Sequence, residues 1–298
     1  MTQLGPTIKY IRQIKGLSQK EVYQGIISRS FAHRLEQGAH SIDAEKFLAI
    51  LVNLDVTPDE FQFIHNHHQL TKNQQAYAKI DTWYQTHNFL ALHHWLVTQK
   101  QSQTDQLKWP IAYAEILIAA YDQKQFPLSK HMFLLLDHLL TEKNWTLNEM
   151  RLAHLLLPLC LPKNTAPLID IEKIKQRMQD NAQQYLKQPN DYFHVTDLLV
   201  EFYGTQFQVL LNQHRYTAAK HLKSDFNTID IQKLTWDGRI TQQLWLAIWE
   251  LYFGDKHKGQ IIIKKLTDLM TLFPVKYHGT LDAIIKVRTA AAADYRKK

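Results

Sequence analysis

The sequence contains few of the residues that cross-link a chain or turn it sharply. Its 298 residues include one cysteine, nine glycines and nine prolines. The single cysteine, Cys160, cannot form an internal disulfide, and one cysteine cannot build a cysteine-based metal site. Because an all-β fold needs many turn residues, this shortage favours an all-α fold.

Long apolar segments and enzyme signatures are missing as well. No stretch reaches the 18 apolar residues of a membrane-spanning helix, and the opening MTQLGPTIKYIRQ lacks the apolar core of a signal peptide. No Gly-rich phosphate loop, paired-histidine zinc signature or Gly-x-Ser-x-Gly motif is present. We therefore expect a cytoplasmic protein that has no membrane partner, is not an enzyme, and has neither a metal site nor a cofactor.

The charge of the chain, +7 overall, is unevenly distributed near its start. Residues 1–40 carry six lysines and arginines against two acids, or +4, whereas residues 41–70 carry one lysine against five acids, or −4. A basic surface beside an acidic one is typical of proteins that bind the phosphates of nucleic acids. Chance surface charge explains an asymmetry of this size equally well.

The first part of the chain carries start and stop signals for five short helices. Ser18 and Glu21 form a capping box for the second helix, expected over 19–24. Ser28 caps the third helix, which ends at Gly38. A tight turn that contains a glycine therefore joins the second and third helices.

The apolar residues of these helices recur at helical spacing and are expected to form one small core. Phe31 and Leu35 lie four residues apart, so they share one side of the third helix. The other expected core residues are Ile8, Ile11, Ile26, Ile27, Phe47, Leu48, Leu51, Phe61 and Ile64.

Two short helices joined by such a turn are a helix-turn-helix, whose second helix enters the major groove of DNA. Arg29 suits guanine O6 and N7, and Ser30 suits several base edges. Helix N-termini bind phosphate, and basic side chains supply the salt-dependent part of the affinity. We therefore predict nine DNA-binding residues: Gln19, Ser28, Arg29, Ser30, His33, Arg34, Arg12, Lys15 and Lys20.

The segments GLSQKEVYQGIISRSFAHRLEQG and IDAEKFLAILVNLDVTPDEF resemble the DNA-binding domain of the Rgg-type regulators. These belong to the peptide-responsive regulators of Gram-positive bacteria called RRNPP proteins. The shared elements are SQKEVY, GIIS, the helix end at Glu36–Gly38, EKF and LDVTPDEF. The resemblance implies a transcriptional regulator of quorum sensing that responds to a peptide pheromone.

The remainder of the chain is expected to form a helical array. The polar segment HNHHQLTK, residues 65–72, is interpreted as a solvated linker. After it, amphipathic helices such as WPIAYAEILIAAYDQ, LSKHMFLLLDHLL and LNEMRLAHLLLPLC alternate with short polar breaks. A weak repeat is marked by Phe89, Phe126, Tyr216 and His257, with a degenerate unit near residues 160–175. Such spacing predicts a tetratricopeptide-like (TPR-like) α-solenoid, whose curvature creates a concave groove.

The resemblance implies that this groove binds a short hydrophobic signalling peptide. Arg151 matches an arginine that faces the peptide in the family and could bind a carboxylate, although a salt bridge to a neighbouring helix explains it equally well. Asn148 can bond a peptide backbone. Tyr203, Gln206 and Trp245 are candidates to line the groove, with packing in the core as the alternative. Cys160 is expected to be a buried, inert thiol.

We therefore predict a helix-turn-helix domain at residues 1–66, a linker at 67–72, and a TPR-like peptide-sensing and dimerisation domain at 73–298. Because one small helix-turn-helix reads few base pairs, we expect a homodimer on palindromic double-stranded promoter DNA. Two alternatives stay open. One is a constitutive regulator whose repeat domain binds a protein partner and no peptide. The other is a repeat protein whose N-terminal domain contacts protein instead of DNA.

Overall fold

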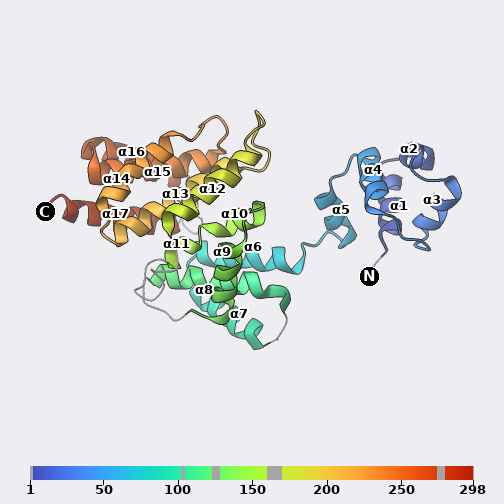
Figure 1. Cartoon of the computed structure of the whole chain (residues 1–298), viewed down its shortest axis with the longest axis horizontal. Helices are drawn as coiled ribbons and strands as arrows, with labels where there is room; N and C mark the ends of the chain where they lie inside the picture. Colours follow the sequence, from blue (N-terminus) through green and yellow to red (C-terminus); the bar gives the residue numbers. More distant parts are fainter. Residues whose placement is uncertain (1–2, 102–104, 123–127, 160–169, 274–278, 298) are drawn as a thin grey trace. The chain divides into compact units, whose positions relative to one another are not determined.

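The computed structural model describes residues 3–101, 105–122, 128–159, 170–273 and 279–297, and every regular element in these ranges is a helix (Figure 1). The chain divides into two compact parts, the N-terminal unit Met1–Ala76 and the C-terminal unit Tyr77–Lys298. The all-α fold class predicted from the sequence is therefore confirmed. The domain limits expected at residues 66 and 73 stay predictions.

The N-terminal unit is a small helical domain around one apolar core. Its helices are α1 Leu4–Ile14, α2 Gln19–Tyr23, α3 Arg29–Glu36, α4 Ala44–Leu54 and α5 Pro58–His65. Ile8 and Ile11 of α1 and Leu35 of α3 are buried in this core, as expected, and Phe31 packs at its edge. One expectation is wrong: Leu48 of α4 is 51% exposed, and Ile50 and Leu54 are buried in addition to the predicted Leu51.

The C-terminal unit consists of helices that pack mainly against their neighbours in sequence, as in a solenoid. They are α6 Lys72–Gln85, α7 Phe89–Gln101, the single 3₁₀ turn η1 Asp105–Leu107, α8 Lys108–Asp122, α9 Lys130–Thr141, α10 Leu147–Ala153, α11 Leu156–Leu159, α12 Ile171–Tyr185, α13 Val195–Asn212, α14 Tyr216–Asn227, α15 Trp236–Phe253, α16 Lys256–Met270 and α17 Gly279–Tyr295. The first residues of α6 belong to the N-terminal unit. The helix α15 contacts α13, α14, α16 and α17, and Figure 1 shows this group of yellow, orange and red helices together.

The repeat markers and the predicted helices fall at definite places in this array. Phe89 and Tyr216 open α7 and α14, and His257 lies in the first turn of α16. The single helix expected over LNEMRLAHLLLPLC is instead two, α10 and α11. Pro158 accounts for the break, because proline has no N–H to donate to the carbonyl four residues earlier, at His154, and its ring clashes with that carbonyl. Phe126 and Cys160 lie outside the described residues.

Several histidines mark places where the backbone turns left-handed. His67, His68, His87, His194 and His214 all have φ between 53° and 59°. Glycine usually fills such positions, and histidine is among the residues that tolerate them. His67 and His68 lie in the segment interpreted as a linker, between α5 and α6. In this chain, which has few glycines, these histidines thus have a local role in ending or starting helices.

Candidate functional site

The helices α2 and α3 begin at the residues that the sequence indicated, and α2 ends at Tyr23, one residue before the expected end. The Ser18 hydroxyl accepts a hydrogen bond from the Glu21 amide at 3.2 Å, and the Ser18 amide donates to the Glu21 carboxylate at 2.7 Å, which completes the capping box. Gly25 turns the chain after α2 with φ +81°. Ser28 then caps α3, its hydroxyl accepting from the Phe31 amide at 3.3 Å. The turn and both caps therefore fix the residue at which α3 begins.

A buried carboxylate joins the first three helices. Glu36, at the end of α3, is 4% exposed. One of its oxygens accepts from Arg12 Nε at 2.6 Å and from the Tyr23 hydroxyl at 2.8 Å. The other accepts from Arg12 Nη2 at 3.0 Å and from Gln19 Nε2 at 2.9 Å. Since these donors come from α1 and α2, Glu36 holds α3 at a set angle to both.

The Glu36 carboxylate stays ionised despite its position. Burial opposes ionisation, but the hydrogen bonds from Arg12, Gln19 and Tyr23 outweigh it and hold the pKa of Glu36 below its usual value. Hydrogen bonding to Glu36 in turn raises the pKa of Arg12. The result is a charged, fully paired centre inside the unit, whereas the sequence had indicated only the end of a helix at Glu36.

The exposed side of α3 carries the predicted recognition residues. Arg29, Ser30, His33 and Arg34 are all exposed, and the guanidinium groups of both arginines lack an ion-pair partner among the described residues. Together with Gln19 of α2 they line a surface hollow of about 610 Å³. Two arginines without an ion-pair partner and several hydrogen-bonding side chains on an open face suit an anionic, hydrogen-bonding partner such as a base edge or a phosphate.

The four other residues predicted to bind DNA lie beside this face or are used within the unit. Ser28 is the cap of α3, and Lys20 is exposed on α2. Arg12 pairs with Glu36 and also donates to the Leu17 carbonyl at 2.9 Å. Lys15 Nζ donates to the carbonyls of Leu54 and Asp55 at the end of α4. Their contacts with DNA stay predictions, and the structure gives Arg12 and Lys15 a role in packing.

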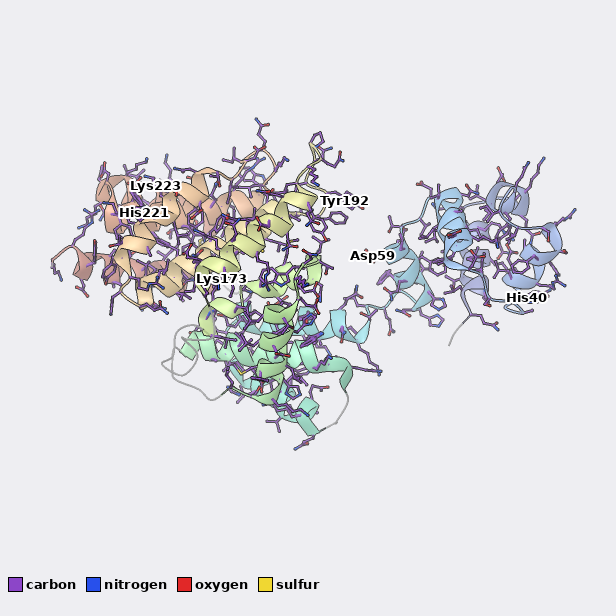
Figure 2. All side chains as sticks on the ribbon, viewed as in Figure 1. His40, Asp59, Lys173, Tyr192, His221 and Lys223 are labelled. Atoms are coloured by element: carbon purple, nitrogen blue, oxygen red, sulfur yellow. The ribbon has the colours of Figure 1, made fainter. Side chains whose placement is uncertain are left out.

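The loop after α3 is held against that helix by a stacked pair of rings. The Phe31 and His40 rings lie 5.3 Å apart and 9° from parallel, and His40 is labelled beside α3 in Figure 2. This contact covers the apolar side of α3, so the side that bears Arg29 and Arg34 is the one left open.

The C-terminal unit contains a cavity of about 500 Å³ between helices distant in sequence. Its lining is mostly apolar with a few hydrogen-bonding groups, a composition typical of ligand sites. The residues come from α6, α8, the α10–α11 region, α13 and α17, and they are Tyr84, Ile116, Leu117, Ala120, Tyr121, His154, Leu155, Pro158, Thr205, Gln208, Val209, Asn212, Ala283, Ile284, Val287 and Arg288.

At neutral pH this cavity has one charged group among its described lining, Arg288 of α17. Burial lowers the pKa of His154 to about 4, so that imidazole is neutral. Arg288 is 4% exposed; its Nη2 donates to Asn212 Oδ1 at 2.7 Å, while its Nε has no hydrogen-bond partner among the described residues. A buried guanidinium with a free donor favours an anionic group in the cavity.

None of the five residues predicted to bind a peptide is in that lining. Arg151 and Asn148 are exposed on α10. Tyr203 is buried and accepts a hydrogen bond from Gln179 at 2.8 Å, and Trp245 packs where Gly204 has no side chain. Gln206 is fully buried, and its amide has no partner among the described residues. Their contact with a peptide stays a prediction, and in this structure the last three belong to the core.

Arg288 and the polar residues of α13 were missed by the sequence reading. A signal for α13 exists, since Asp197, Glu201, Thr205 and Gln208 recur at helical spacing in an otherwise apolar segment. For Arg288 the only signal is a cation within a helix of small and apolar residues, which is too common to be specific.

Two kinds of site find no support in the described part of the chain. No three histidine, cysteine or acidic side chains approach one another there as a metal site requires. Nor does any described helix combine the length and apolar character needed to cross a membrane.

The comparisons with known proteins concern both parts of the chain. A family model described as helix-turn-helix matches residues 8–61. A protein of Listeria monocytogenes EGD-e assigned to the transcriptional regulators has 20% identity and a TM-score of 0.72, covering 99% of this chain and 98% of its own. The SHP pheromone receptor Rgg2 of Streptococcus dysgalactiae has 15% identity and a TM-score of 0.64, with 99% of both chains covered.

A third solved structure contains a bound peptide and DNA. Bacillus thuringiensis PlcR, in complex with the peptide PapR7 and DNA, has 13% identity and a TM-score of 0.64, covering 96% of this chain and 99% of its own. At such identities the likeness is one of fold, and it extends over both units. The similarity of fold implied by the resemblance is confirmed: residues 8–61 match a helix-turn-helix family, and the chain shares the fold of the Rgg-type regulator Rgg2 over 99% of its length.

Proposed function

We propose that this protein is a cytoplasmic transcriptional regulator that binds promoter DNA through α3 and responds to a short peptide bound in the cavity of its C-terminal unit. The observation that carries the DNA-binding part is the open hollow lined by Gln19, Arg29, Ser30, His33 and Arg34. Its unpaired cations and its position on the second helix of a helix-turn-helix match the chemistry of base edges and phosphates.

A homodimer on a palindromic site is part of the proposal. The α3 helix has eight residues, so one copy can contact only a few base pairs. Two copies related by a two-fold axis double the contacts, and the two half-sites would lie about one helical turn of DNA, or a multiple of it, apart.

Selection of duplexes from a random pool, followed by gel shifts of the selected sequence, tests the DNA-binding part. Arg29→Ala should weaken binding by about 1–3 kcal/mol and relax the preference at one base position. Lys46→Ala is the matched control, because its ammonium is already paired with Asp43 at 2.7 Å. Equal binding and equal sequence preference by the two variants would reject α3 as the recognition helix.

The response to a peptide rests on the cavity between α6, α8, α13 and α17. Its apolar lining suits hydrophobic side chains, and its amide and hydroxyl groups suit a peptide backbone. Because a ligand there contacts helices from both ends of the unit, it would favour one arrangement of the array over others. We infer that this shift changes the spacing of the two DNA-binding units in the dimer.

A further inference from the structure

One side of α13 bears a line of polar residues that runs out of the cavity. Thr205, Gln208 and Asn212 line the cavity itself. Asp197 and Glu201 continue the same line toward the start of the helix, because residues four apart share one side. This line therefore joins the cavity to a pair of acids on α13.

The acidic end is built by three helices, each one turn before a cavity residue. Glu201 precedes Thr205 on α13, Asp81 precedes Tyr84 on α6, and Tyr113 precedes Ile116 on α8. The Tyr113 hydroxyl donates to Asp81 at 2.7 Å. Glu201 is accessible to solvent, and its charge interacts with those of Asp197 and Asp81. Glu201 and Asp81 thus lie one turn from the cavity residues Thr205 and Tyr84. Asp197, whose carboxylate accepts from the Thr235 amide at 3.2 Å, lies one turn further from the cavity along α13.

These acids repel one another, and a cation would relieve the repulsion. Desolvation by the surrounding helices, with the charges of Asp197 and Asp81, raises the pKa of Glu201 to about 7. Burial likewise raises the pKa of Asp81, in spite of the hydrogen bond from Tyr113. Of the described neighbours, His194 lies 3.9 Å from Asp197 and is charged only when protonated.

The opposite end of the line carries positive charge. Arg288 donates to Asn212 and, at 3.5 Å, to the carbonyl of Gln208, while its Nε has no partner among the described residues. The groove, meaning the cavity with its extension along α13 to Glu201, is therefore negative beside Glu201 and positive beside Arg288. Between them, apolar side chains of α8 and α17 face the polar line of α13.

The distance between the acidic end at Glu201 and the basic end at Arg288 sets the length of a peptide that can reach both. Glu201 and Asn212 are 11 residues apart on α13, and a rise of about 1.5 Å per residue separates them by about 16 Å. An extended peptide advances about 3.3 Å per residue, so it covers that span with about five or six residues.

We propose, on the basis of the function proposed above, that the groove binds a peptide of about five or six residues in one direction, its free amino group at Glu201 and Asp81 and its free carboxylate at Arg288. The two charged ends determine the direction. Between them the apolar residues of α8 and α17 accept hydrophobic side chains, and the polar line of α13 suits the peptide backbone. A guanidinium binds a carboxylate through paired donors, which a C-terminal amide cannot replace.

Synthetic random peptide libraries test the proposal with the full chain. The libraries contain four, six or nine residues drawn from Ala, Gly, Val, Leu, Ile, Phe and Trp. Each is made with both ends free, with an acetylated amino end, or with an amidated carboxyl end. Bound peptides are identified by mass spectrometry after affinity selection, and the affinities of the best ones are measured by calorimetry.

We expect the six-residue peptides with free ends to bind best, and blocking either end to cost about ten- to a hundredfold in affinity. Arg288→Met should abolish the preference for a free carboxylate and leave the preference for a free amino end. Glu201→Gln should have the opposite effect. Arg239→Met, at a half-buried position, and Glu172→Gln, at an exposed one, are the matched controls, because neither residue lines the cavity.

Because Arg288 is buried, its replacement by methionine can disturb the fold. Arg288→Lys retains the charge and provides a second variant, which should keep part of the preference for a carboxylate. If blocked peptides bind as well as free ones, or direction and length have no effect, the inference is wrong although the groove still binds peptides. If no library binds in any form, the proposed peptide response itself fails.

Discussion

Replacing Glu36 by glutamine should loosen the N-terminal unit more than any exposed change in it. Glutamine has the same shape, but one carboxylate oxygen becomes an amide NH₂, which cannot accept a hydrogen bond. The carboxylate accepts four bonds, two at each oxygen. In either orientation of the new amide, two of these bonds are lost and donors face one another.

The size of the effect follows from this count. A hydrogen bond to a charged group contributes about 1.5–3 kcal/mol, and removing one partner of a buried ion pair costs about 3–5 kcal/mol. Relief of the carboxylate's own desolvation offsets part of this, so we expect a loss of about 3 kcal/mol. A domain of this length has a free energy of unfolding of about 4–11 kcal/mol, so the loss is a large fraction of it.

Hydrogen exchange of the full chain, followed by mass spectrometry, measures this loss within one unit. Amides of α1 and α3 should exchange about a hundredfold faster in Glu36→Gln, because about 1.4 kcal/mol corresponds to a factor of ten. Amides of α13 and α15, in the other unit, serve as the internal reference. The matched control is Glu21→Gln, an exposed acid in the α2 capping box, with an expected loss below about 1 kcal/mol.

The two variants must differ for this reasoning to hold. If Glu36→Gln accelerates exchange no more than Glu21→Gln does, the network does not hold α1, α2 and α3 together.

The pH dependence of exchange in the wild type is a second test of the Glu36 network. The pKa of Glu36 is lowered in the folded state, so its contribution is complete above the unfolded pKa and is lost as the pH falls through the folded pKa. Protection of α1 and α3 should therefore fall further in acid below about pH 4.5 in the wild type than in Glu36→Gln, which keeps only the smaller contributions of other acids such as Glu21 and Asp43.

Three further predictions concern packing and charge. Gly5→Ala should destabilise the N-terminal unit by about 3 kcal/mol, measured by urea unfolding. The new Cβ would lie 1.7 Å from the Leu35 carbonyl oxygen, so α1 would have to move away from α3. An unchanged urea midpoint would show that the two helices are not in such close contact. Gly204→Ala should destabilise the C-terminal unit by about 1–3 kcal/mol, because its Cβ would lie 2.1 Å from Trp245 Nε1. Urea unfolding checks this prediction too, and an unchanged stability would mean that the indole can move aside. Glu201→Gln should raise the free energy of unfolding at about pH 8.5 and change it little at about pH 4.5. The folded state raises the pKa of Glu201, so it disfavours the charged form that predominates at high pH. An equal gain in the free energy of unfolding at both pH values would point to packing instead.

Local sequence signals were enough for the helix-turn-helix. The caps at Ser18 and Ser28 and the left-handed glycine at position 25 act within a few residues, so they can be read from the chain. The spacing of Phe31 and Leu35 likewise separates the packed side of α3 from the side that bears Arg29, Ser30, His33 and Arg34. The hollow lined by these four residues and Gln19 is where the sequence had placed the recognition face.

Local signals failed where a partner lies far away in the sequence. Arg12 and Lys15 look like free cations, but their partners are 24 and about 40 residues later, in Glu36 and at the end of α4. Leu48 has the periodicity of a core residue, yet about half of its surface is exposed. Tyr203 and Trp245 are similar in type to groove residues, and only the packing of α13 against α15 places them in the core.

The amino-acid sequence by itself determined the helices of the helix-turn-helix, their caps, the class of fold and the exposed face of α3, because each depends on contacts between residues close along the chain. The tertiary structure alone decided the Glu36 network and the groove between Glu201 and Arg288, because their members come from helices up to about two hundred residues apart. The order of residues along a chain carries no direct measure of which distant side chains meet, and folding supplies that information only through the packing of whole helices.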